Sequence, residues 1–163
     1  PASLRRVAAP AGGTRVQVQI VPTEKRVQRP AYAWIAFVLA VFTGVLAIPV
    51  GLMFIADPTG GSIGLPPGWI EGTPFGSYMV PGFYLLLMNG VGMLVLAGLI
   101  LLRHWSAPWL TAILGVGLII WILVQLVVMP ETMILQWIFL ATGVVLGFVA
   151  LFWLRRTGQL RLP

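Results

Sequence analysis

Three amide side chains fall inside the long apolar runs of this sequence, and they are the residues there that could do polar chemistry: Asn89, Gln125 and Gln136. Gln125 and Gln136 each lie about four residues from the short turn that joins two of the runs, which corresponds to about 6 Å of helix. Asn89 lies about one turn deeper. The amides could hold helices together by hydrogen bonds, or they could form a polar niche for a lipid headgroup or a pigment substituent. The first interpretation is the simpler one.

The single histidine, His104, is the one side chain that suggests a cofactor. A neutral imidazole nitrogen can ligate the metal of a haem or a chlorophyll. His104 stands between Arg103 and Trp105 directly after an apolar run, so an interfacial anchor is the simpler interpretation. We expect no intrinsic cofactor, and only peripheral contacts with lipid, (bacterio)chlorophyll or carotenoid.

Other patterns that carry catalysis or bind metals are missing from the sequence. It contains no cysteine, which excludes disulfides and thiolate metal sites. The apolar runs contain no Asp, Glu, Lys or Arg, whereas proton relays and ion-coupled transporters nearly always need an ionisable residue in the membrane. The sequence therefore predicts no catalytic residue, no metal site and no enzyme activity.

Four apolar runs must position these residues. The chain has 163 residues, of which 59% are hydrophobic and 9% charged, against about 25% charged in a soluble domain. The runs cover residues 32–55, 79–102, 109–129 and 133–154, and about 20 residues of helix span a bilayer. The sequence predicts an all-α integral membrane four-helix bundle with up-down topology. Residues 56–77 form its long outer connection, and residues 155–163 form a short tail.

The charged residues indicate the orientation of this bundle. Basic residues precede the first run, follow the second and follow the fourth, while three of the four acidic residues fall in the other two connections. This is the positive-inside pattern, and it predicts that both termini are cytoplasmic. The net charge of +6 therefore reflects membrane orientation and gives no reason to expect nucleic acid as a partner. Nine of the ten basic residues are arginine, which is typical of GC-rich bacterial genes and favours a multi-pass protein of the bacterial inner membrane.

Small residues at a spacing of four mark the expected helix contacts. Ala36, Ala40 and Gly44 follow this spacing in the first run, and Gly143 and Gly147 form a GxxxG pair in the fourth. Such stripes let two helices approach closely in a membrane.

Residues 1–31 form a basic N-terminal arm that cannot build a core of its own. Polar and apolar residues alternate from Arg15 onward, with Val16, Val18 and Ile20 on one face, which is typical of a β-strand. Because the chain offers no second strand, we expect the arm to extend along another polypeptide. The alternative is an unstructured tail that its arginines hold near anionic lipid.

Residues 64–92 contain three short motifs: Gly64-Leu65-Pro66, a TPF-x-x-Y-x-x-PG element from Thr73 to Gly82, and Asn89-Gly90. In these motifs the chain resembles an uncharacterised family of small four-span bacterial membrane proteins. The resemblance covers the outer connection and, loosely, the second to fourth runs, but not the arm. It implies the four-span topology and no activity.

Together these features predict a non-enzymatic accessory subunit of a larger membrane complex, of an energy-transducing kind such as photosynthetic or respiratory electron transport. Its partners would be other membrane subunits and lipids. The alternative is a stand-alone carrier of a small molecule or a lipid.

Overall fold

A computed structural model describes residues 30–70 and 73–159, and within these residues the protein is helical and contains no strand. Residues 1–29 of the N-terminal arm, which include Arg15, Val16, Val18 and Ile20, lie outside the described residues. The elements are α1 (Ala31–Ala56), η1 (Gly61–Ile63), η2 (Pro67–Trp69), α2 (Met79–Tyr84), η3 (Leu85–Gly92), α3 (Met93–Leu101), α4 (Ala107–Val128) and α5 (Ile134–Arg156).

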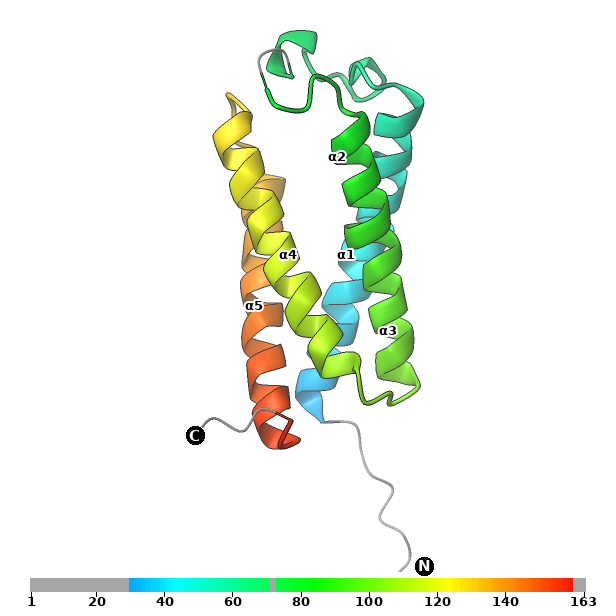
Figure 1. Cartoon of the computed structure of the whole chain (residues 1–163), viewed down its shortest axis with the longest axis vertical. Coiled ribbons are helices and arrows are strands. Elements are labelled where there is room, and N and C mark those ends of the chain that lie inside the picture. The colour runs from blue at the N-terminus through cyan, green and yellow to red at the C-terminus, as the bar shows by residue number, and fades with distance from the viewer. Residues whose placement is uncertain (1–29, 71–72, 160–163) are drawn as a thin grey trace, which may run out of the picture.

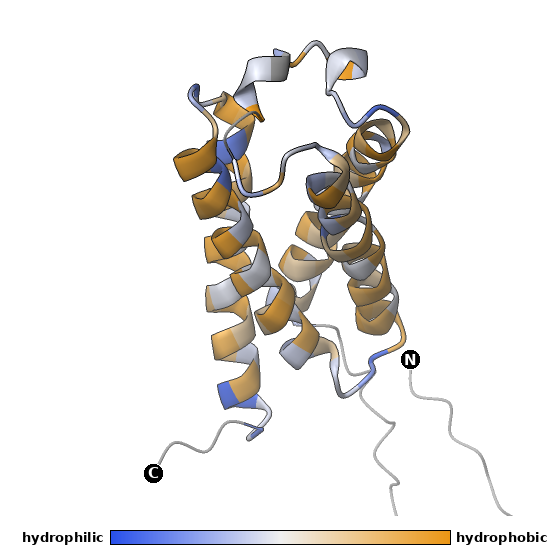
Figure 2. Cartoon of the chain, turned by 45° about the horizontal axis from the view of Figure 1, so that its top comes forward, coloured by the Kyte–Doolittle hydropathy of each residue, from blue (hydrophilic) through white to orange (hydrophobic). Residues whose placement is uncertain are grey.

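Four helices are long and apolar enough to span a membrane, as the sequence predicts. The second of them, Met79–Leu101, combines α2, the π-helical segment η3 and α3. Consecutive spans run in opposite directions, so that the first and last described residues lie at the same end of the bundle (Figure 1). We refer to this end as the termini end, and to the other, which carries residues 57–78, as the loop end. Apolar residues cover the spans along their length, and the strongly hydrophilic ones gather near the two ends (Figure 2).

Glycines set the contact between α1 and the second span. A Cβ atom added at Gly51 would lie 2.8 Å from the backbone nitrogen of Leu86, and one added at Gly82 would lie 3.0 Å from the carbonyl oxygen of Gly51. A Cβ atom at Gly44 would lie 2.9 Å from a methyl carbon of Leu94. The two helices therefore pack with their backbones close together, as small residues permit in membranes.

A second pair of glycines sets the contact between α4 and α5. A Cβ atom at Gly115 would lie 3.0 Å from Cβ of Leu146, and one at Gly143 would lie 3.1 Å from the carbonyl oxygen of Gly115. A Cβ atom at Gly147 would meet no atom within 4 Å, so Gly143 is the member of the predicted pair at which a side chain would collide.

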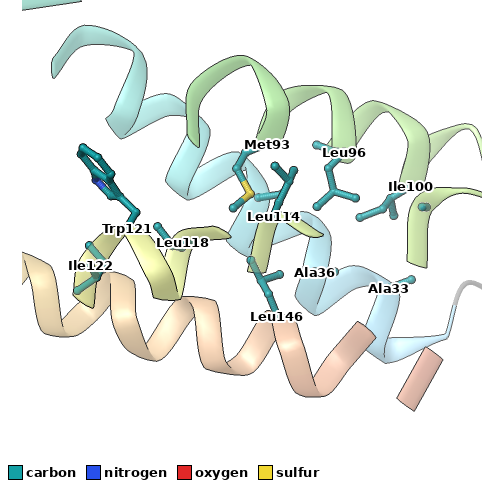
Figure 3. Close-up of a cluster of buried hydrophobic side chains, with 13 residues drawn as sticks. Ala33, Ala36, Met93, Leu96, Ile100, Leu114, Leu118, Trp121, Ile122 and Leu146 are labelled. Atoms are coloured by element: carbon teal, nitrogen blue, oxygen red, sulfur yellow. The ribbon is translucent and has the colours of Figure 1, made fainter. Parts of the chain in front are cut away.

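The two helix pairs meet in a core that lies mainly toward the termini end. Ala33, Ala36 and Ala40 of α1 are buried there, and their small side chains let α3 and α5 approach. Larger side chains from the other spans fill the space between them. Trp121 lies at one end of this row and Ala33 near the other (Figure 3). The predicted contact residues Ala36 and Ala40 thus lie in the core.

Residues 57–70 and 73–78 fold over the loop end. Ile70 and Tyr78 are buried, and the Tyr78 ring stacks on Phe54 of α1 with 4.8 Å between ring centroids. The backbone N–H of Tyr78 donates to the carbonyl of Pro58 at 2.9 Å, which joins the two ends of the connection. The connection is therefore a cap on the bundle and not only a link.

At the termini end, α3 and α5 finish in the same way. The N–H of His104 donates to the carbonyl of Leu99, and the N–H of Gln159 donates to that of Leu154. These bonds close Schellman motifs, in which the residue after the C-cap takes a left-handed conformation. That residue is Gly158 (φ 68°) after α5 but Arg103 (φ 55°) after α3.

Candidate functional site

A cavity of ≈ 340 Å³ lies inside the bundle, between the core and the loop end. We refer to it as the bundle cavity. All four spans line it, and Ile63 and Leu65 of the loop connection also contribute. It forms where the α1–second span pair and the α4–α5 pair separate toward the loop end (Figure 1). The same loop residues pack against Phe54, so the connection bounds the cavity on that side.

Each span contributes at least one polar side chain to this otherwise apolar lining. Those side chains are Thr43 of α1, Asn89 of η3, Trp121 and Gln125 of α4, and Gln136 of α5. None of the described lining residues is ionisable. The site is therefore electrically neutral and offers hydrogen bonds but no charge.

Thr43 is the lining residue of α1 with a free hydroxyl. Its side chain is 1% exposed, and its Oγ1 has no hydrogen-bond partner among the described residues. A threonine in a helix commonly donates to the carbonyl four residues earlier. Thr111 and Thr142 do so, at 2.7 and 2.9 Å. Thr43 is thus a buried polar group that its own helix does not satisfy.

Asn89 belongs to the π-helical segment η3, which interrupts the second span from Leu85 to Gly92. π-helical turns inside α-helices are rare and are frequent at functional sites. The Asn89 side chain is 2% exposed, and its Nδ2 has no partner among the described residues. Amide groups buried without a partner are uncommon, because each costs about 1–3 kcal/mol.

Trp121 of α4 is held in place by Tyr84. The two rings stack with 4.3 Å between centroids, and the Tyr84 hydroxyl donates to the carbonyl of Gly117 at 2.9 Å. Trp121 is buried, and its Nε1 has no partner in the described part of the chain. The indole therefore contributes a fixed aromatic side chain to the lining, and its N–H group is buried without a partner among the described residues.

Gln125 and Gln136 both line the bundle cavity. Within the described ranges no hydrogen bond joins the two amides. Gln136 instead caps the start of its own helix, because its Oε1 accepts from the N–H of Met133 at 3.0 Å. Its Nε2 lies 3.5 Å from Sδ of Met129, at the end of α4. For Gln136, a helix cap therefore takes the place of a direct hydrogen bond between the two amides.

The bundle cavity reaches the protein surface between α1 and α5. Its lining includes Leu46 of α1 and Met133 and Leu135 at the start of α5, and all three are exposed. Toward the termini end, α1 and α5 come together again, with Phe42 and Phe139 rings 6.3 Å apart. Because Leu46 and Leu135 lie within the apolar spans, this mouth would open sideways into the bilayer.

His104 lies far from the bundle cavity, in the connection between α3 and α4. It is exposed, and its Nδ1 lies 2.7 Å from Oγ of Ser106. It lines a second cavity of ≈ 250 Å³ at the termini end, together with Arg103 and Trp105. The ligand role predicted for His104 stays a prediction. Among the described residues no group of three His, Cys, Asp or Glu could hold a metal ion.

Thr43 and Trp121 are the polar lining residues that the sequence analysis did not single out. Thr43 directly precedes Gly44 on the small-residue face of α1, which is a signal that its side chain points inward. Trp121 stands well inside a span, whereas tryptophan is enriched at membrane interfaces. An interior position for this residue is a signal of a specific contact.

Comparison with protein-family models, with curated proteins and with solved structures finds no match for this chain. The resemblance to a family of small four-span bacterial proteins therefore rests on its three motifs alone. The fold and the site define the class: a helical protein with four candidate membrane spans and a neutral, mostly apolar cavity among them.

Proposed function

We propose that this protein is a non-enzymatic membrane subunit that holds one lipid-soluble molecule in the bundle cavity. The observation that carries the proposal is the bundle cavity itself, which all four spans line and whose described lining is neutral. Three of its lining residues, Thr43, Asn89 and Trp121, also carry a buried polar atom that has no partner among the described residues. Polar residues that serve only to hold helices together would bond to one another. Natural proteins leave such groups unsatisfied mainly where function needs them.

The size and lining of the cavity support a bound molecule. Small-molecule sites are clefts of about 300–1,000 Å³, mostly apolar, with a few polar groups that fix orientation. At ≈ 340 Å³ the bundle cavity falls at the lower end of that range. A single water needs only about 10–15 Å³, so one or two waters would not fill it.

The setting that we propose is a larger membrane complex of the energy-transducing kind, in the bacterial inner membrane, with both termini on the cytoplasmic side. The positive-inside distribution of the arginines supports the orientation. In this setting residues 1–31 would tether the subunit to a neighbouring polypeptide, and the bundle would hold a lipid or cofactor at the periphery of the complex.

A stand-alone carrier is the second candidate, and the sideways mouth at Leu46 and Leu135 favours it. A carrier must exchange its ligand with the bilayer, and a mouth between two spans provides a route. Purification from native membranes in mild detergent distinguishes the two: a subunit co-migrates with larger partners, and a carrier runs alone. Deletion of residues 1–28 should release a subunit from its complex without removing the spans from the membrane.

Native mass spectrometry tests the binding itself. Protein extracted from its own membranes should carry one additional non-covalent mass per chain. Ala47→Phe, which fills the cavity from the buried face of α1, should remove that mass, while the same change at the exposed Ala141 of α5 should not. Thermal unfolding of both variants checks that they are folded. An additional mass that folded Ala47→Phe retains would contradict the proposal, and so would its absence from the unaltered protein.

A further inference from the structure

We propose that the cavity of ≈ 250 Å³ at the termini end binds the headgroup of an anionic phospholipid, independently of what fills the bundle cavity. We refer to it as the termini cavity. Its lining includes Arg103 and His104, both of which are exposed, and no described lining residue is acidic. A guanidinium and an imidazole both donate hydrogen bonds to phosphate oxygens, so the lining suits an anion.

Contacts between the ends of the spans shape the termini cavity. The start of α1, the connection between α3 and α4 and the end of α5 lie at the same end of the bundle (Figure 1). Gln159 Nε2 donates to the carbonyl of Trp105 at 3.2 Å, which joins the chain after α5 to that connection. The rings of Tyr32 and Trp153 lie 5.4 Å apart, which joins α1 to α5. All four of these residues line the cavity.

The backbone of Arg103 takes a conformation that favours glycine. Its φ is 55°, and the matching position after α5 is a glycine, Gly158, with a φ of 68°. A residue with a Cβ atom bears a steric cost in this region, and such strained residues cluster at functional sites. Glycine would close the turn after α3 at lower cost, but it would leave the termini cavity without its guanidinium. This choice of residue is the observation that carries the proposal furthest.

The neighbouring His104 contributes a second donor. Its Nδ1 accepts a hydrogen bond from the backbone N–H of Ser106 at 3.3 Å. Because a backbone N–H can only donate, the neutral ring carries its proton on Nε2. The imidazole can therefore donate from Nε2 beside the charged group of Arg103.

The aromatic part of the lining favours a lipid over a free anion. Tyr32, Trp105 and Trp153 line the termini cavity where the apolar spans end, and Trp105 is 70% exposed. Tyrosine and tryptophan are enriched at the level of the lipid headgroups. Basic pockets between spans on the cytoplasmic side bind acidic headgroups, and the proposed orientation puts the termini end on that side. The phosphate would lie at Arg103, with the acyl chains along the apolar outer surface of the spans.

Native mass spectrometry of the purified full chain tests this proposal, with phosphatidylglycerol and phosphatidylcholine of identical acyl chains as the two probes. We expect one phosphatidylglycerol per chain, held at concentrations that leave phosphatidylcholine unbound. Arg103→Gln should weaken this binding about tenfold or more, which is the loss of one hydrogen bond between charged groups. Arg155→Gln is the matched control, because it removes an exposed arginine at the same end that does not line the cavity, and it should leave the affinity within about twofold.

Arg103→Gly separates binding from folding. It relieves the left-handed backbone and removes the guanidinium, so it should bind phosphatidylglycerol as weakly as Arg103→Gln while it melts at or above the temperature of the unaltered protein. A lower melting temperature for lipid-free Arg103→Gly would assign the side chain to the fold and overturn the proposal. Equal retention of the two lipids, or equal losses for Arg103→Gln and Arg155→Gln, would also overturn it. Displacement of the lipid by inorganic phosphate would identify a site for a free anion and overturn the lipid assignment.

Discussion

Replacement of Asn89 by leucine separates the two roles that a buried amide can have in this bundle. The two side chains are of similar size, so Asn89→Leu removes the polar atoms with little change in packing. Asn89 is 2% exposed and its Nδ2 has no partner among the described residues. If that atom serves a ligand, the ligand-free protein bears the cost of the unsatisfied group, about 1–3 kcal/mol. Asn89→Leu should then raise the free energy of unfolding of the ligand-free protein.

The alternative role gives the opposite sign. If Asn89 held two helices together by a hydrogen bond, its loss would lower stability, by ~0.6 kcal/mol on average and by up to ~1.7 kcal/mol in membrane proteins. Each kcal/mol corresponds to about 2–4 °C in the melting temperature of a chain this size. Circular dichroism in detergent micelles, on protein stripped of lipid-soluble molecules, measures the shift. A lower melting temperature for Asn89→Leu, with ligand binding unaffected, would refute the binding role of Asn89.

Three further outcomes follow from the packing, the loop and the charges. Gly82→Ala places a Cβ atom 2.8 Å from Cβ of Phe54 in α1 and should lower the free energy of unfolding by about 1–3 kcal/mol. Gly98→Ala is the control, because its Cβ atom would meet no atom within 4 Å, and thermal melts of the two variants should show a loss of stability for Gly82→Ala alone. The Thr59 hydroxyl and the Ser62 N–H donate to the Asp57 carboxyl and hold its pKa below the ordinary value of 3.8, so the loop should keep these bonds above that pH and lose them as the pH falls through the lower folded-state pKa. Hydrogen exchange at the Ser62 amide reports this change, and rapid exchange of that amide at neutral pH would contradict the prediction. In the cysteine-free chain, Ser62→Cys should react with an impermeant thiol reagent from outside the cell and Thr157→Cys should not, and the reverse labelling would contradict the proposed orientation.

The four spans could be predicted from the sequence because hydrophobicity and length alone determine whether a helix can cross a bilayer. The small-residue face of α1 was also predictable, since its spacing is a property of the chain. The partners of those small residues were not. The sequence does not indicate that Gly44 meets Leu94, because that contact depends on how two helices cross.

The candidate site was predictable only in part. The depth of Gln125 and Gln136 follows from counting residues from the turn, and both line the bundle cavity. Their bonding does not follow, because Gln136 has a competing partner, the free N–H of Met133 at the start of its own helix. The π-helical turn at Asn89 depends on tertiary packing, and the orientation of the Thr43 hydroxyl is a rotamer choice that sequence does not encode. The site therefore emerged from the arrangement of spans and not from any motif.

The most direct test of the central claim is an experimental structure of the full chain in nanodiscs that contain lipids and other lipid-soluble molecules extracted from its own membranes. We expect an elongated density that fills the bundle cavity and leaves it between Leu46 and Leu135. A closed cavity in which Asn89 Nδ2 donates to a carbonyl of a neighbouring span would contradict the account.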